Sequence, residues 1–167
     1  MTSTERMPRT AVVIVASTRA ASGVYTDRTG PVIAAWFAER GFTVVGPDVV
    51  ADGKPVRGAL RQALAAAPAV IVTTGGTGLA PGDATPEATD ALLDREVPGF
   101  MEELRRRGAA NTPTALLSRG VAGVAGSTFI VNLPGSSGGV RDGLAVLDDV
   151  LEHVIDQLAG GDHPSAE

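Results

Sequence analysis

Three short apolar runs, separated by segments of helical length, constrain the fold of this chain more than any other feature. The runs cover residues 11–16, 42–45 and 69–73, and β-branched residues are common in them. Runs with so little polar alternation are typical of strands buried on both faces of a parallel sheet. Apolar residues recur at helical spacing after Pro31 and again from about Pro55. The alternation predicts an α/β fold of three layers, α/β/α, with a mostly parallel sheet and helices on both faces.

The rest of the chain predicts further helices and two more strands. A helix is expected to begin at Thr85, with Thr85 as its capping residue, and a shorter one to contain residues 100–104. Residues 121–126 and Thr128–Leu133 predict two short strands or a hairpin. Between residues 140 and 158, apolar side chains return every three or four positions, which predicts a long final helix.

Length and composition limit what the protein can be. The 167 residues suffice for one domain, expected over residues 10–159, with residues 1–9 and 160–167 as disordered tails. A net charge of −5 and short basic clusters argue against a nucleic-acid partner. With no cysteine and two histidines, a metal would have to be held mainly by oxygen. Because no apolar run suits a signal peptide or a membrane span, no membrane partner is expected and the expected location is the cytoplasm.

The glycine-rich and polar loops all follow predicted strands. In an open parallel sheet, ligands bind beyond the carboxyl ends of the strands, where neighbouring loops meet. Residues 75–78, Gly-Gly-Thr-Gly, let the backbone approach a phosphate closely. A second loop, residues 134–136, opens the final helix, whose N-terminus favours an anion. Either loop alone could be a turn that only reverses the chain, but two at one edge favour a nucleotide or another phosphorylated ligand.

Two aspartates, Asp48 and Asp83, are expected in the loops after the second and third strands. Each alone is more typical of a turn, where aspartate is common. Beside phosphate-binding loops, however, two carboxylates could share a Mg²⁺ ion, which needs only one or two carboxylates in addition to phosphate oxygens. Asp48 and Asp83 are therefore the predicted Mg²⁺ ligands.

A set of motifs spread over most of the chain occurs together. The motifs are residues 21–27, 73–78 with 83–89, 97–100, 117–119 and 130–136. Together they resemble the MogA/MoaB-type molybdopterin-binding family, which includes bacterial molybdopterin adenylyltransferase and a domain of gephyrin. The resemblance implies an ATP- and Mg²⁺-dependent enzyme. In its reaction the phosphate of molybdopterin attacks the α-phosphate of ATP, giving adenylylated molybdopterin and pyrophosphate.

The same resemblance implies the site residues. Asp48 and Asp83 match the two essential, catalytic aspartates of the family, and Ser118 matches the serine of its pterin site. The chain departs from the family pattern at Thr18, where many relatives carry aspartate, and at Gly82, where arginine is common. It is similar in length to the shorter, MoaB-like members. The residues expected to bind substrate are Ser17, Thr18, Thr74, Gly75, Gly76, Thr77, Gly78, Thr85, Ser118, Asn132, Pro134, Gly135 and Ser136.

Partners and an alternative function also follow from the resemblance. Members of the family form trimers, and the apolar helix face at Trp36 and Phe37 is compatible with a homotrimer, or with a hexamer built from two. A downstream molybdate-inserting enzyme would consume the product. The alternative is a non-catalytic carrier of the MoaB type that binds molybdopterin without adenylylating it. The presence of both aspartates favours catalysis, and a molybdate-inserting enzyme that contains this fold would need additional domains.

Overall fold

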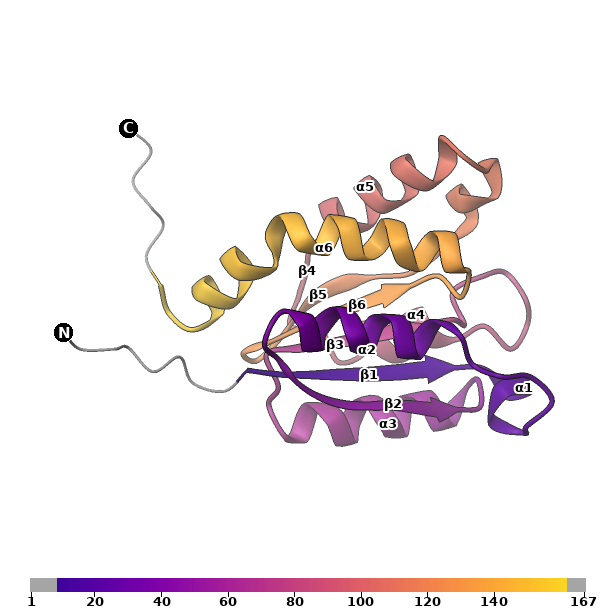
Figure 1. Cartoon of the computed structure of the whole chain (residues 1–167), viewed down its shortest axis with the longest axis horizontal. Coiled ribbons are helices and arrows are strands. Elements are labelled where there is room, and N and C mark those ends of the chain that lie inside the picture. The colour runs from indigo at the N-terminus through magenta and orange to yellow at the C-terminus, as the bar shows by residue number, and fades with distance from the viewer. Residues whose placement is uncertain (1–8, 162–167) are drawn as a thin grey trace.

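A mixed sheet of six strands forms the middle of the protein, whose computed structural model describes residues 9–161. The strands lie in the order β2-β1-β3-β6-β5-β4 (Figure 1). Parallel pairs join β1 to β2 and to β3, and β3 to β6, whereas β5 is antiparallel to both β6 and β4. The predicted, mostly parallel sheet is confirmed, with an antiparallel edge. The strands are β1 Thr10–Ala16, β2 Thr43–Val50, β3 Val70–Thr74, β4 Arg95–Glu96, β5 Ala122–Ala125 and β6 Thr128–Leu133.

Helices cover both faces of this sheet. α2, α5 and α6 pack on one face, and α3 and α4 pack on the other (Figure 1). The long final helix, α6, begins where sequence predicts, because the Ser136 side chain accepts a hydrogen bond from the Gly139 N–H and so caps its first turn. The helices are α1 Thr18–Ala21, α2 Thr29–Glu39, α3 Lys54–Ala65, α4 Thr85–Asp90, α5 Pro98–Ala109, the 3₁₀ helix η1 Pro113–Leu117 and α6 Ser137–Leu158.

Two apolar clusters fill the spaces between the layers. Phe37 of α2 and Leu147 of α6 are fully buried in the larger cluster, and Leu60 of α3 is fully buried in the smaller one. Neighbouring residues of a central strand face opposite clusters: Val72 of β3 belongs to the first and Ile71 to the second. The strands are therefore buried on both sides, as their uninterrupted apolar runs predict.

The second strand continues further than sequence predicts. The pairing register with β1 shifts opposite Gly46 and Pro47, and pairing resumes at Asp48, which lies beside Ile14. Gly46 and Pro47 lie in this irregularity, so the strand continues past a Gly-Pro pair that would otherwise end it. The prediction that Asp48 lies in a loop after the strand is therefore wrong, and Asp52 lies in that loop instead.

Two further predictions need correction. Thr85 does not cap α4, because Ala84 occupies the cap position and the Thr85 hydroxyl makes no hydrogen bond. Arg9, assigned to a disordered tail, instead pairs with Glu152 and stacks on the ring of Phe42. The rest of the predicted tails, apart from residues 160 and 161, lies outside the described residues. Across residues 9–161, no helix has the length and hydropathy needed to cross a membrane.

Candidate functional site

A hollow of about 970 Å³ lies at the carboxyl ends of β3 and β6. Its walls come from the loop after β3, the first turn of α6, the end of α5 and the segment that contains η1. The hollow brings together most of the residues predicted to form a site, although they are up to 61 positions apart in the sequence. Those lining it are Gly75, Gly76, Thr77, Gly78, Asp83, Ser118, Pro134, Gly135 and Ser136.

The glycine loop after β3 needs glycine for steric reasons. Gly75 and Gly76 have φ angles of +89° and +68°, a region that other residues adopt at a cost. A Cβ atom on Gly75 would overlap the carbonyl oxygen of Ala16, and one on Gly135 would lie 3.3 Å from the Cα of Gly75. The two glycine-rich loops thus touch backbone to backbone. This leaves their surface free of bulky side chains, as close approach of a phosphate requires.

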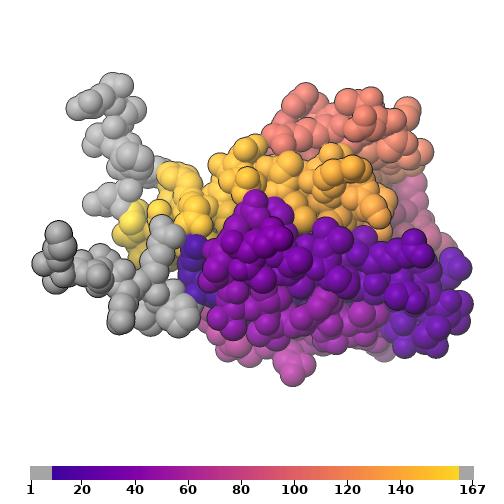
Figure 2. Space-filling model, in the orientation of Figure 1, coloured from indigo at the N-terminus to yellow at the C-terminus, as the bar shows by residue number. Residues whose placement is uncertain are grey.

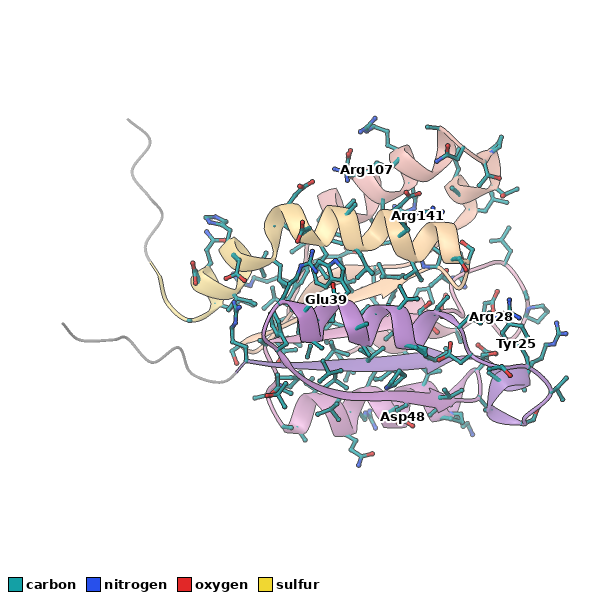
Figure 3. All side chains as sticks on the ribbon, viewed as in Figure 1. Tyr25, Arg28, Glu39, Asp48, Arg107 and Arg141 are labelled. Carbon is teal, nitrogen blue, oxygen red and sulfur yellow. The ribbon has the colours of Figure 1, made fainter. Side chains whose placement is uncertain are left out.

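Two carboxylates flank the glycine loop, and one of them is not the residue that sequence predicts. A Cβ atom on Gly78 would lie 2.7 Å from Oδ2 of Asp83, and one on Gly76 would lie 3.1 Å from Oδ1 of Asp52. The other oxygen of Asp52, Oδ2, accepts hydrogen bonds from the Thr18 N–H at 3.0 Å and from the Thr18 hydroxyl at 2.9 Å. Asp48 is exposed on β2 and does not line the hollow (Figure 3).

Two predicted substrate-binding residues are buried inside the protein. Asn132 is fully buried, where its amide group donates to the hydroxyls of Thr73 and Thr89 and accepts from the Val121 N–H. It therefore joins β3, α4 and the start of the hairpin rather than contacting a ligand. Thr85 is 1% exposed, and its unpartnered hydroxyl lies against Gly76. Thr85 thus supports the glycine loop from inside the protein, where its backbone N–H also donates to the Gly76 carbonyl at 3.2 Å.

A smaller hollow of about 120 Å³ shares Gly75 and Gly135 with the large one. Ser17 and Thr74, both predicted site residues, line it together with Tyr25 and Arg28 from the loop before α2 (Figure 3). The Thr74 hydroxyl donates to the Pro134 carbonyl at 2.8 Å, which ties the two glycine-rich loops together. The site thus consists of two hollows separated by the backbone of two glycines.

Arg119 contacts the loop that follows Gly78, and the sequence predicts no role for it beyond its place in the motif at residues 117–119. Its guanidinium donates from Nε to the Gly78 carbonyl at 2.9 Å and from an Nη atom to the Asp83 carbonyl at 2.7 Å. A second Nη atom forms a close ion pair with Glu87, and this pairing lowers the pKa of the Glu87 carboxyl. The sequence feature that points to Arg119 is its position directly after Ser118, a predicted site residue that lines the hollow.

The carboxylates beside the glycine loop would fit a metal ion that arrives with a phosphorylated ligand. Within residues 9–161, no three acidic or histidine side chains gather closely enough to hold a metal ion by themselves. Two carboxylates beside a glycine loop would complete a Mg²⁺ shell together with phosphate oxygens and water. The N-terminus of α6, which lines the same hollow, would add a favourable potential for the phosphate charge.

Comparison with known proteins identifies the group to which this site belongs. A family model described as a probable molybdopterin binding domain matches residues 12–153. The chain belongs to the molybdopterin-binding domain family. A bifunctional molybdenum cofactor biosynthesis protein from Synechococcus elongatus is 40% identical over 154 residues, which are 92% of this chain and 48% of that protein. A molybdopterin adenylyltransferase from Helicobacter pylori is 33% identical over 155 residues, 89% of this chain and 86% of that one.

Solved structures of molybdopterin-binding domains share the whole fold. A molybdopterin biosynthesis Mog protein from Mycobacterium ulcerans is 58% identical with a TM-score of 0.87, and the match covers 90% of this chain and 99% of that one. The chain spans about half the length of the bifunctional curated relatives, at 48% for the Synechococcus protein. It spans most of the length of the adenylyltransferases.

Proposed function

We propose that this protein is a molybdopterin adenylyltransferase of molybdenum cofactor biosynthesis. The observation that carries the proposal is the convergence of a glycine loop, the Asp83 carboxylate and a helix N-terminus on one hollow, with the Asp52 carboxylate beside Gly76 of the same loop. Relatives that this chain covers over most of their length are named for this activity. The bond formed joins a phosphate oxygen of molybdopterin to the α-phosphorus of ATP. The bond broken is that between the α-phosphorus and the oxygen bridging to the β-phosphate, whose electron pair leaves with pyrophosphate.

The chain's own residues bind and orient the two substrates in this proposal. The backbone of Gly75–Gly78, which carries only the small Thr77 side chain, holds phosphate groups at close range. Ser118 lies on the same wall, where its hydroxyl donates to the Thr77 hydroxyl at 3.2 Å, and it would contact the pterin. The first turn of α6 stabilises the negative charge that the two substrates bring together. Holding both phosphates across Gly75 and Gly135 converts a bimolecular encounter into a reaction within one complex.

The Mg²⁺ ion would lie between the glycine loop and the two carboxylates, Asp52 and Asp83. When bound, it neutralises charge on the phosphates of ATP and so makes the α-phosphorus easier to attack. The role predicted for Asp48 passes to Asp52 in this proposal, because Asp52 lies beside Gly76 and Asp48 does not. Thr18 restrains the Asp52 carboxylate through Oδ2, which leaves Oδ1 facing the loop.

Paired variants at positions 52 and 48 test the proposal. Asp52→Asn and Asp83→Asn should each lower the rate of adenylyl transfer at least about tenfold, because an amide is a poorer Mg²⁺ ligand than a carboxylate. Asp48→Asn, the matched control, should stay within about twofold of the wild type, since its side chain is exposed on β2. The assay mixes pure protein with molybdopterin, ATP and Mg²⁺ and measures adenylylated product. Binding of molybdopterin without any product would instead favour the non-catalytic carrier.

We also propose that the protein assembles as a homotrimer. The face on which α2 and α6 lie side by side (Figure 2) supports this, because it carries a hollow of about 510 Å³ whose lining includes Val32, Trp36 and Leu144. Val32 is 53% exposed there, as expected for an apolar side chain that a second subunit covers. Light scattering coupled to size exclusion should report three times the chain mass, and a mass near 17 kDa would contradict the trimer. Hexamers, transfer of product to a molybdate-inserting enzyme and a cytoplasmic location stay predictions.

A further inference from the structure

We propose that Arg119 is a positioning residue that fixes the Asp83 carboxylate relative to the glycine loop. The proposal rests on the proposed function, because it assigns Arg119 a role in the same site. Arg119 reaches both ends of the loop that begins at Gly78 and ends at Asp83, and it bonds the carbonyl group at each end. A single planar guanidinium thus sets the distance between the two ends.

The loop between these two carbonyls has little else to hold it. Leu79, Ala80, Pro81 and Gly82 are all exposed, and the Leu79 side chain is 66% exposed. Within the loop, the Ala80 N–H donates to Oδ2 of Asp83 at 3.2 Å, and the Asp83 N–H donates to the Ala80 carbonyl at 2.9 Å. The orientation of the carboxylate therefore depends on the shape of this loop. If its ends separate, Asp83 moves away from Gly78.

Arg119 itself is held firmly by the core of the domain. Its backbone N–H donates to the Thr77 carbonyl at 2.8 Å, so its main chain is joined to the glycine loop directly. On either side, the carbonyls of Ser118 and Gly120 accept hydrogen bonds from Arg105 of α5, at 2.7 and 3.2 Å. Position 120 is tightly packed, because a Cβ atom there would lie 2.9 Å from the end of the Met101 side chain and 3.0 Å from the Asn132 carbonyl oxygen. Arg105 therefore fixes the segment from which Arg119 reaches the loop.

A lysine at position 119 separates positioning from charge. Lysine keeps the positive charge beside Glu87, but its single nitrogen cannot match the fork geometry that bonds two carbonyls. Arg119→Ala should lower kcat about 100-fold, the loss expected when a catalytic group is misplaced by about 1 Å, and Arg119→Lys should show a smaller loss in the same direction. The KM for ATP should change less than kcat in both variants. Added guanidinium ion should restore part of the kcat of Arg119→Ala and none of that of Asp83→Asn.

Arg107→Lys is the matched control. The side chain of Arg107 (Figure 3) is 32% exposed against 34% for Arg119, and it makes two charged hydrogen bonds, to Glu103 and to Asp149. The Arg107→Lys variant should keep kcat within about twofold of the wild type. Arg119 variants that keep wild-type kcat, or that lose it with no response to guanidinium and a matching fall in stability, would overturn the positioning role.

Amide hydrogen exchange tests the proposal without the reaction. In Arg119→Lys, the Ala80 N–H should exchange about tenfold faster than in the wild type, while amides in β1 and β3 keep their rates. Unchanged exchange at Ala80 would overturn the proposal even if the enzyme loses activity. An inactive wild-type protein with the expected change at Ala80 would contradict the proposed function alone and leave the structural role of Arg119 supported.

Discussion

Replacing Gly76 by alanine should destabilise the protein through two separate physical effects. The φ angle of +68° costs a residue with a Cβ atom about 1–2 kcal/mol. The new Cβ would also overlap the hydroxyl of Thr85, which is 1% exposed and so cannot swing into solvent. Overpacking of this kind costs about 1–3 kcal/mol. The free energy of unfolding should therefore fall by about 2–5 kcal/mol.

Two comparisons isolate these effects. Gly82 lies in the same segment, but nothing lies within 4 Å of a Cβ atom added there, so Gly82→Ala should change the unfolding free energy by less than about 0.5 kcal/mol. In a Thr85→Ala background the overlap is absent, and Gly76→Ala should then cost only the backbone part, about 1–2 kcal/mol. Urea unfolding at one fixed protein concentration, with equal m values, measures the free energies of unfolding of the wild type, the three single variants and the double variant.

Two results would refute this reasoning. If Gly76→Ala destabilises no more than Gly82→Ala, the left-handed backbone at Gly76 is not required. If Gly76→Ala lowers the free energy of unfolding equally in the wild type and in the Thr85→Ala background, the Thr85 hydroxyl does not clash with the new Cβ atom. Because Gly76 also lies beside Asp52, the variant should lose adenylyl transfer as well, whereas Gly82→Ala should keep it.

Two further predictions concern stability. Thr85→Val replaces a buried, unpartnered hydroxyl by a methyl group of the same shape and should raise the free energy of unfolding by about 1 kcal/mol; a loss in the same urea experiment would show that the hydroxyl has a partner. Hydrogen bonds from Arg106 and Arg107 lower the pKa of Glu103 from 4.5 to about 2, so its stabilising contribution should be complete above pH 4.5 and be lost as the pH falls through 2. Glu103→Gln should therefore differ from the wild type in melting temperature more at pH 6 than at pH 2, and an equal difference at both values would contradict this.

The parts of the fold that sequence predicts well are those specified by local patterns. The strands β1 and β3 are uninterrupted apolar runs, and α6 repeats its apolar residues every three or four positions. The glycine loop after β3 was predictable for the same reason, since only glycine accepts its backbone angles without strain. Each of these features can be recognised within a short window of sequence.

The parts that sequence reasoning missed depend on contacts between distant segments. Whether Gly46-Pro47 ends β2 is decided by β1, which shifts its register and continues to pair. Because β2 therefore continues to Val50, the aspartate in the loop after the strand is Asp52 and not Asp48. Arg119 donates hydrogen bonds to the Asp83 and Gly78 carbonyls, which are 36 and 41 positions away, and the sequence around Arg119 does not indicate these partners. Asn132 is polar, as a ligand-binding residue would be, but its side chain makes three hydrogen bonds to other groups inside the protein.

The presence of threonine rather than aspartate at position 18 has a consequence for the charge beside Asp52. Thr18 and Asp52 form a reciprocal pair, in which the Thr18 hydroxyl donates to Oδ2 and accepts from the Asp52 N–H at 3.1 Å. An aspartate side chain at position 18 would lack the hydroxyl that donates to Asp52, leaving only the backbone N–H as donor, and the two carboxylates would repel each other. With threonine at position 18, the chain places one fewer negative charge beside Asp52 than it would with aspartate at that position. The lower charge reduces repulsion of phosphate, and the hydrogen bonds from Thr18 hold Asp52 in place without needing a cation between the two side chains.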